Sequence, residues 1–281
     1  MINPSSAERT LRLHAPDFSL EHTLESAQMF RVAKRDGGYV AHAGDMRFFA
    51  RQSGDTLEIA APAGADERFF AHFFALDEPA GEICGRLSGL PELAGAVRAH
   101  RGLRLLRQDP WECLVGFVCS SCCNVPRIQR MVGALCDAAG RRTGGRGGWR
   151  GFPDAGKLPS EAAMRRLGTG YRAAYLARLN EPRVRWWLEG LRLMPFAQAR
   201  AALTALPGVG EKVADCVLLY SLGFRQAFPV DTWVRRAMLA THFRGRRASD
   251  RDIQRLAAER YGPDAGYAQQ FLFHAWRTKK L

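Results

Sequence analysis

The chain has 281 residues, 47% hydrophobic and 25% charged, which is the composition of an ordinary globular protein with one large or two moderate domains. No apolar run approaches the ~20 residues that a membrane span needs, which excludes a helical membrane protein. The formal net charge of +13 favours a polyanionic partner, because each cation that meets a phosphate releases a counterion. The alternative explanation of the charge is the arginine-rich composition of a GC-rich source.

The N-terminal residues contain no basic segment followed by an apolar one, so we expect an intracellular protein, cytoplasmic and nucleoid-associated or nuclear, that is not secreted. Seven cysteines are an odd number, which fits a reducing compartment better than a disulfide framework. Only Cys119 and Cys122 have CxxC spacing, and no second pair or nearby histidine completes a ligand set. We therefore expect no metal site and no cofactor.

The N-terminal part is predicted to form an antiparallel sheet. Short, partly alternating runs separated by Gly or Asp turns indicate strands at 12–14, 39–42, 46–50 and 56–60. From Asp66 onward the pattern becomes helical. Four phenylalanines, at 69, 70, 73 and 74, recur at helical spacing, which indicates core packing.

Helices are predicted to dominate after Gly102. Asp109 followed by Pro110 is a good helix start, because Asp can cap and Pro suits the first helical position. A glycine- and arginine-rich stretch at 140–148 is predicted to be a flexible loop that either touches a DNA backbone or is simply solvated. The remaining helices are expected at 111–118, 125–139, from 160, 196–205, 211–222, 231–243 and 267–277.

The most informative stretch, LPGVGEKVADC at 206–216, joins two of these helices through a tight turn. Gly208 and Gly210 remove side chains where the backbone must bend or approach a ligand. The unpaired amides at the start of the next helix can hold a phosphate, with help from the helix dipole. A plain turn between two helices is the alternative interpretation.

Lys212 and Asp231 indicate that the hairpin belongs to a catalytic site. Lys212 lies in the first turn of its helix, where the dipole disfavours a cation, and a neutral amine can form a Schiff base. Cys216 and Tyr220 share its helical stripe and could line a pocket for a flat base. Asp231, 19 positions beyond the lysine, can cap a helix and also stabilise a cationic sugar.

With these features the sequence resembles the 8-oxoguanine DNA glycosylases of the helix-hairpin-helix glycosylase superfamily. The resemblance covers nearly the whole chain, and its motifs follow the family order. Besides the hairpin, it depends on AQMFR at 27–31, GLRLLRQDP at 102–110, CSSCCNVPRI at 119–128, LGTGYR at 167–172 and AQQFLF at 268–273.

The resemblance implies an α+β fold: an N-terminal antiparallel β-domain similar to half of a TATA-binding protein, then a mostly α-helical glycosylase domain. We place the first domain at 1–95, with trailing helices, and the second at 96–281, with the hairpin at 197–223. The implied activity is base excision repair of duplex DNA by a glycosylase that also nicks the strand at the abasic site, after the damaged base is flipped out. A monomer is expected, since no assembly surface is indicated.

The resemblance also implies roles for individual residues. Lys212 matches the nucleophile and Asp231 the assisting carboxylate. Leu206, Gly208 and Gly210 match the phosphate-binding hairpin. The base pocket would comprise Ala27, Cys216, Tyr220, Gln269 and Phe273. On the duplex side, Tyr171 matches the aromatic wedge, while Arg172, Arg127 and Cys122 occupy positions that face the opposite base.

Four positions depart from the family pattern and cluster around the base. Ala27 replaces a glycine whose carbonyl accepts the N7 hydrogen of 8-oxoguanine, and Cys122 replaces an asparagine that contacts the opposite cytosine. Trp233 replaces a histidine near a phosphate, and Tyr220 replaces a smaller or more flexible side chain. The reaction type is therefore better defined than the lesion. Two alternatives stay open: a glycosylase for another modified purine, for example an alkylated one, and a DNA-binding protein without catalysis.

Overall fold

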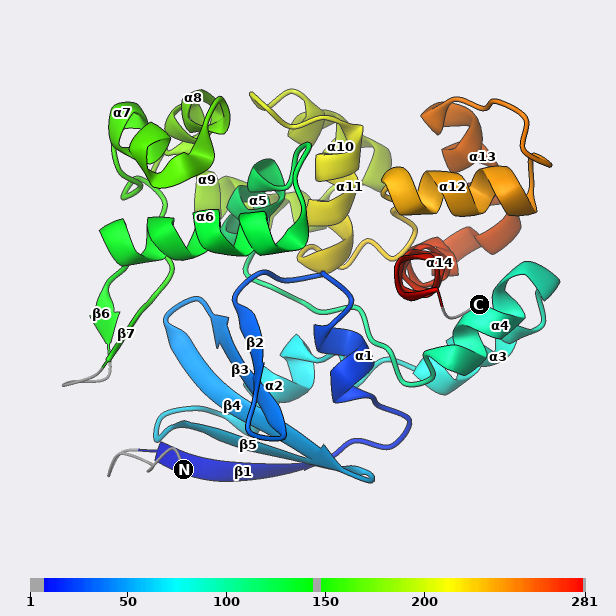
Figure 1. Cartoon of the computed structure of the whole chain (residues 1–281), viewed down its shortest axis with the longest axis horizontal. Helices are drawn as coiled ribbons and strands as arrows, with labels where there is room; N and C mark the ends of the chain where they lie inside the picture. The colour runs from blue at the N-terminus through cyan, green and yellow to red at the C-terminus, as the bar shows by residue number, and fades with distance from the viewer. Residues whose placement is uncertain (1–7, 144–147, 280–281) are drawn as a thin grey trace.

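The computed structural model describes residues 8–143 and 148–279 of the chain. A five-stranded sheet occupies one side of the molecule with a short helix, 67–73, against it, and the helices of residues 110–278 form the other side (Figure 1). Positions 144–147 of the predicted basic loop lie outside the described residues, and the segments beside them pair as a short hairpin, β6 (Arg142–Thr143) with β7 (Trp149–Arg150).

The sheet is antiparallel throughout, with strand order β1-β5-β4-β3-β2. Its turns use residues that tolerate positive φ: Asp36 and Gly37, with φ of 48° and 77°, close the β2–β3 hairpin in the two-residue arrangement that suits the twist of paired strands. The four predicted strands are confirmed, and β2 is an addition. The strands are β1 (Glu8–His14), β2 (Val32–Arg35), β3 (Gly38–Ala43), β4 (Met46–Ser53) and β5 (Thr56–Pro62).

Alternate residues of these strands point into one apolar cluster, which helix α2 (Glu67–Phe73) covers. Phe70, Phe73 and Phe74 from α2 and its C-terminus surround the buried Phe48 of β4, with ring centroids 5.0–6.1 Å apart. The predicted core role is thus confirmed for three of the four phenylalanines. It is wrong for Phe69, whose position on the outer face of α2 leaves it 36% exposed.

The predicted helices are confirmed within a few residues, and their caps explain where they begin. Asp109 accepts hydrogen bonds from the amides of Trp111 and Glu112, and Asp231 accepts one from Val234. Helices α1, α8, α9 and α13 were not expected. The helices are α1 (Leu20–Leu24), α2 (Glu67–Phe73), α3 (Ala80–Ser88), α4 (Pro91–Ala99), α5 (Pro110–Cys119), α6 (Val125–Ala139), α7 (Glu161–Met164), α8 (Arg172–Leu179), α9 (Val184–Gly190), α10 (Phe196–Thr204), α11 (Glu211–Tyr220), α12 (Thr232–Thr241), α13 (Asp250–Tyr261) and α14 (Ala265–Thr278).

A second, larger apolar cluster fills the helical side. Ile83 and Leu87 of α3 and Leu93 of α4 belong to this cluster, so the two helices that trail the sheet pack with the helical part. Domain limits at residue 95 stay a prediction. Within residues 8–143 and 148–279, no helix combines the length and the apolar character of a membrane span.

Candidate active site

The hairpin predicted at 206–210 connects α10 to α11, and its shape depends on Gly208. Gly208 has a φ of +76°, and a Cβ atom there would lie 2.4 Å from the ring of Tyr175. A side chain is therefore excluded both by the backbone conformation and by the ring. Gly210 begins α11 without a capping side chain, so the first amides of this helix are available to a ligand.

Lys212, in the first turn of α11, reaches across to the end of α5. Its Nζ donates a hydrogen bond to Ser120 Oγ at 3.0 Å and lies 5.0 Å from the centre of the Phe117 ring. Ser120 in turn donates its hydroxyl proton to the carbonyl of Phe117 at 2.7 Å. The serine therefore presents a lone pair to the lysine and fixes the position of the amine. Ser120 was not identified from the sequence, although it lies within the CSSCCNVPRI motif.

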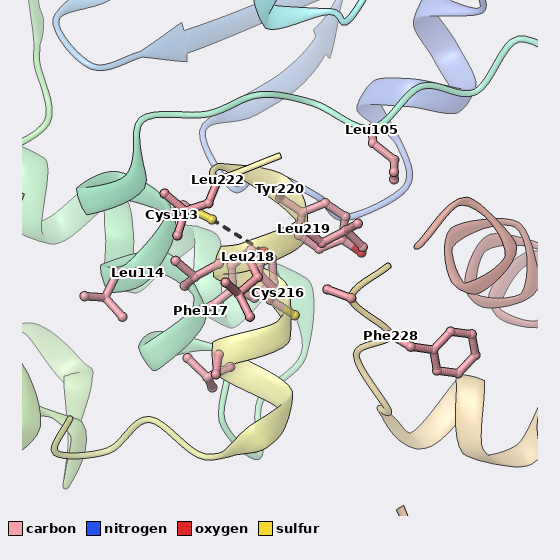
Figure 2. Packing of buried hydrophobic residues seen from close by; sticks show 14 of the residues in the cluster. Leu105, Cys113, Leu114, Phe117, Cys216, Leu218, Leu219, Tyr220, Leu222 and Phe228 are labelled. Atoms are coloured by element: carbon pink, nitrogen blue, oxygen red, sulfur yellow. Dashed lines mark hydrogen bonds between the residues drawn. The ribbon is translucent and has the colours of Figure 1, made fainter. Parts of the chain in front are cut away.

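Cys216 and Tyr220 follow Lys212 at intervals of four residues, which places them on the same side of α11. Figure 2 shows the Cys216 and Tyr220 side chains packed among buried residues of α5 and α11. The rings of Tyr220 and Phe117 stack with centroids 5.5 Å apart. Burial raises the pKa of the Cys216 thiol to about 12, against the opposing effect of the Lys212 charge, so Cys216 is a neutral thiol. Burial also raises the pKa of Tyr220 well above its usual range, so the phenol keeps its proton.

The Tyr220 hydroxyl contacts α14, and Gln270 of α14 extends the network to the segment before β2. It lies 2.5 Å from Gln270 Oε1 and 3.2 Å from Gln269 Oε1, and Gln270 Nε2 donates to the carbonyl of Ser26 at 2.8 Å. All four residues are buried. Ser26 precedes Ala27, so this network ties together three parts of the predicted base pocket. Gln270 was missed in the sequence because only its neighbour Gln269 matched a family role.

Asp231 combines capping with burial at the start of α12. Its Oδ1 accepts the Val234 amide at 2.8 Å. Burial raises the pKa of Asp231 above its ordinary value, while the Val234 amide and the Lys212 charge act in the opposite direction. The Lys212 charge thus favours the ionised carboxylate, and the catalytic role of the pair stays a prediction.

A cleft of about 840 Å³ brings most of the predicted residues together. Ala27, on its rim, has a φ of +56°, a conformation that favours glycine. A second cavity, of about 890 Å³, lies between the sheet and α5 and contains none of the predicted residues. The predicted residues that line the cleft are Ala27, Cys122, Gly210, Lys212, Cys216, Tyr220, Asp231, Trp233, Gln269 and Phe273.

Arg277, also unpredicted, covers one side of the Phe273 ring at the cleft. Its guanidinium carbon lies 5.4 Å from the ring centroid, and its Nη2 donates to the carbonyl of Glu25. The arginine connects α14 to the N-terminal part of the chain, in the same direction as Gln270. A base that stacks on Phe273 would therefore meet the ring face that Arg277 leaves open.

Of the four residues predicted for the duplex side, Cys122 lines this cleft and the other three lie next to residues that line it. Tyr171 is 49% exposed at the start of α8, as a wedge requires, and Arg127 is exposed in the first turn of α6. Arg172, by contrast, is buried: its Nη2 donates to the carbonyl of Ser121 and its guanidinium lies 4.5 Å from the Tyr171 ring. Cys122 is exposed with a φ of +49°.

Known proteins match this chain along nearly its whole length. Residues 10–114 match the family described as 8-oxoguanine DNA glycosylase, N-terminal domain. A relative from Methanothermobacter thermautotrophicus, named "Probable N-glycosylase/DNA lyase", is 34% identical over 67% of this chain and 68% of its own length. The chain belongs to the 8-oxoguanine DNA glycosylase family.

Two further comparisons agree with this assignment. The "N-glycosylase/DNA lyase OGG1" of Arabidopsis thaliana is 38% identical over 66% of the chain, and the chain spans about half of that relative, 55% of its length. The Clostridium acetobutylicum 8-oxoguanine glycosylase/lyase, solved with dsDNA containing cytosine opposite 8-oxoG, superposes with a TM-score of 0.90 at 29% identity over 100% of this chain and 99% of that one. The α+β fold expected for an 8-oxoguanine DNA glycosylase is confirmed.

Proposed function

We propose that this chain is a bifunctional N-glycosylase/DNA lyase that removes 8-oxoguanine from duplex DNA. The observation that carries the proposal is the amine of Lys212, held by Ser120 within the same cleft as the carboxyl of Asp231. A basic protein with a net charge of +13 suits a DNA duplex as its partner. Activity on 8-oxoguanine follows from the family and from the Clostridium relative, which was solved with that lesion.

The proposed reaction begins when the damaged nucleotide leaves the stack and enters the cleft. Once the Lys212 ammonium has released a proton to solvent, its amine attacks C1′ of the sugar. The glycosidic bond breaks, and its electron pair leaves with the base, which takes up a proton. The Asp231 carboxylate stabilises the positive charge that develops on the sugar. The nitrogen, positively charged after the attack, loses one proton to solvent. The C1′–O4′ bond then breaks, its electron pair goes to O4′, which takes up a proton, and the nitrogen and C1′ become joined by the double bond of the protonated Schiff base. Removal of a C2′ proton then expels the 3′ phosphate and nicks the strand.

We assign residues of the cleft and its surroundings to contacts with the flipped base and with the duplex. Phe273 and Cys216 would lie on either side of the flipped purine, Gln269 would read its Watson–Crick edge, and the Ala27 carbonyl would accept the N7 hydrogen. The free amides at Gly210 would hold a phosphate next to the lesion. On the duplex side the assigned residues are Tyr171 as wedge and Arg127, Arg172 and Cys122 at the opposite base.

Arg172 needs a rearrangement to take this role, because its guanidinium is engaged by the Ser121 carbonyl. Insertion of Tyr171 between base pairs would remove the ring from above Arg172 and expose it. We further assign the protein a monomeric state and a place where chromosomal DNA lies, in the cytoplasm of a bacterium or in a nucleus.

The experiment that tests the proposal is borohydride trapping on a duplex with one 8-oxoguanine opposite cytosine. We expect a covalent adduct with the wild type and none with Lys212→Gln, which should still bind the duplex. Undamaged, alkylated-purine and abasic duplexes run alongside. An adduct that persists in Lys212→Gln would exclude Lys212 as the nucleophile.

The same experiment separates the remaining alternatives. The positive φ of Ala27 and the bulk of Tyr220 at the base position favour, as second candidate, a glycosylase for another modified purine. Trapping on the abasic duplex but not on 8-oxoguanine would support that candidate. No adduct and no nick on any duplex would instead support a DNA-binding protein without catalysis.

A further inference from the structure

Three histidines from distant parts of the sequence meet behind the cleft. His22 lies on α1, His100 directly follows α4, and His274 lies on α14. Their ring centroids are 5.0 Å apart for His22 and His100, 4.3 Å for His100 and His274, and 5.9 Å for His22 and His274. His100 and His274 are buried, whereas His22 is half-buried. The three histidines thus connect α1, the end of α4 and α14, which are far apart in the sequence.

The spacing of the ring nitrogens suits a metal ion. One nitrogen from each histidine lies within 4.8 Å of the other two. A point placed between the three nitrogens is therefore no more than about 2.8 Å from each of them. A Zn–N bond is ~2.0–2.1 Å long. Side-chain torsions can supply the remaining difference of under ~1 Å, because the three rings belong to separate elements and rotate independently.

The chemistry of the donor set indicates the kind of ion. Neutral imidazole suits Zn²⁺ and neighbouring transition metals, whereas Mg²⁺ and Ca²⁺ prefer oxygen ligands. No cysteine or carboxylate belongs to this group among the described residues, so the ligands are imidazoles alone. Three histidines leave a fourth tetrahedral position for water, and the half-buried His22 provides the side open to solvent.

We propose that His22, His100 and His274 bind one Zn²⁺ or a similar transition-metal ion. The ion links α1, α4 and α14. Because His274 directly follows Phe273, which lines the cleft, the ion would fix the helix that carries the base-stacking ring. No sequence pattern indicated this site, because the three histidines lie 78 and 174 positions apart in the chain. The expectation that no metal is bound was based on the spacing of the cysteines.

One neighbouring contact must change when the ion binds. Arg277 Nη2 lies 3.5 Å from His274 Nδ1, a long contact in which Nδ1 acts as acceptor. An ion on Nε2 leaves the proton on Nδ1, so the arginine loses this contact and keeps its hydrogen bond to the Glu25 carbonyl. Metal binding would then affect the position of the Phe273 ring in two ways, through the neighbouring His274 and through Arg277, which lies over the ring.

The test uses the full-length protein stripped with a chelator and titrated with Zn²⁺, without DNA. We expect one equivalent of bound zinc by elemental analysis, and a rise in Tm of about 5 °C at a large excess of zinc over Kd. Co²⁺ in its place should give the visible absorption of a four-coordinate site. Because no readout involves catalysis, failure of this proposal is distinct from failure of the glycosylase proposal.

Variants distinguish the trio from other zinc ligands. His22→Gln, on the half-buried member, should fold and bind zinc at least tenfold more weakly, and His22→Gln/His274→Gln should bind none. The matched control His72→Gln, on α2, should bind like the wild type. So should Cys122→Ser/Cys123→Ser, which removes the two cleft cysteines that are not buried. Absence of zinc from the wild type, or equal affinity in His22→Gln and His72→Gln, would overturn the proposal.

Discussion

The hydroxyl of Tyr220 lies 2.5 Å from Gln270 Oε1, and Gln270 Nε2 is held by the Ser26 carbonyl at 2.8 Å. A hydroxyl has one proton, and the fixed amide of Gln270 receives it. The same hydroxyl lies 3.2 Å from Gln269 Oε1, so Tyr220 faces both amide oxygens and orients the Gln269 side chain. With Oε1 held at Tyr220, the Nε2 amide of Gln269 is the group that can donate to the edge of a base in the cleft.

We therefore predict that Tyr220→Phe slows excision of 8-oxoguanine about tenfold, or ~1.4 kcal/mol, because Gln269 loses its orientation. Nicking of an abasic duplex, which carries no base, should change less than about twofold. Single-turnover rates on the two duplexes measure the difference. Tyr261→Phe is the matched control, since Tyr261 is also buried with a hydrogen-bonded hydroxyl but lies outside the cleft. Equal losses on both duplexes would refute this positioning role.

Ser120 is predicted to position the nucleophile. Ser120→Ala removes the acceptor 3.0 Å from Lys212 Nζ, and we expect adduct formation to slow about tenfold on 8-oxoguanine and abasic duplexes alike. The initial rate of borohydride trapping measures the effect. Ser121→Ala is the neighbouring control: among the described residues the hydroxyl that holds Lys212 Nζ is that of Ser120, and the variant retains the Ser121 backbone carbonyl. An unchanged trapping rate in Ser120→Ala would exclude this role.

Asp231 should make the excision rate fall on the acid side, or acid limb, of the pH–rate profile, at a higher pH than an aspartate with an ordinary pKa would. Its pKa is raised by burial, and catalysis needs the carboxylate, so the excision rate falls as pH decreases through this raised pKa. Asp231→Asn should reduce the rate on the order of 100-fold and remove that limb from the pH–rate profile. A profile with the same acid limb in the variant would assign the limb to another group.

The same substitution should not destabilise the protein at neutral pH. Because the folded pKa of Asp231 is above its unfolded value, its favourable contribution to stability is present at acid pH and is lost as pH rises through the folded pKa. Asparagine resembles the protonated form and still caps α12. We expect the free energy of unfolding at pH 7 to match or slightly exceed that of the wild type, by under ~1 kcal/mol in urea titrations. A large loss would show that the charge itself supports the fold.

The two hairpin glycines should respond differently to alanine. Gly208→Ala combines positive φ with a clash against Tyr175 and should cost about 3 kcal/mol of unfolding free energy. Gly210→Ala has a φ of −85° and open space around the new methyl group, so its cost should stay under ~1 kcal/mol. Equilibrium unfolding of the pair tests this; similar values for both variants would contradict the assigned role of Gly208.

Opposite-base preference should depend on Cys122. Asparagine tolerates the φ of +49° at this position better than most residues and adds a hydrogen-bond donor and acceptor. We expect Cys122→Asn to raise the ratio of excision opposite cytosine to excision opposite adenine several-fold, and Arg127→Ala to lower it. Cys84→Ser, on α3 away from the cleft, should leave the ratio unchanged. A ratio that stays constant in Cys122→Asn would remove this residue from the opposite-base contact.

Local signals in the sequence were sufficient for much of the architecture. The Gly208 turn, the Asp109 and Asp231 caps and the alternating strands each involve residues close in the chain, whose conformational preferences act whatever the rest of the fold does. The association of Lys212 with Asp231 was also visible, because the helix start and the cap are local features at a short separation. Phe69 was misplaced because helical spacing does not reveal where the buried face of a helix ends.

Only the tertiary structure decided the contacts between distant segments. Ser120 beneath Lys212, Gln270 between Tyr220 and Ser26, and the three histidines each join residues that no periodic pattern relates. Their proximity depends on how α5, α11 and α14 pack against one another and against the N-terminal part of the chain. Packing geometry arises from the whole set of side chains in both apolar clusters, so the composition of the pocket could be expected from the sequence whereas its hydrogen bonding could not.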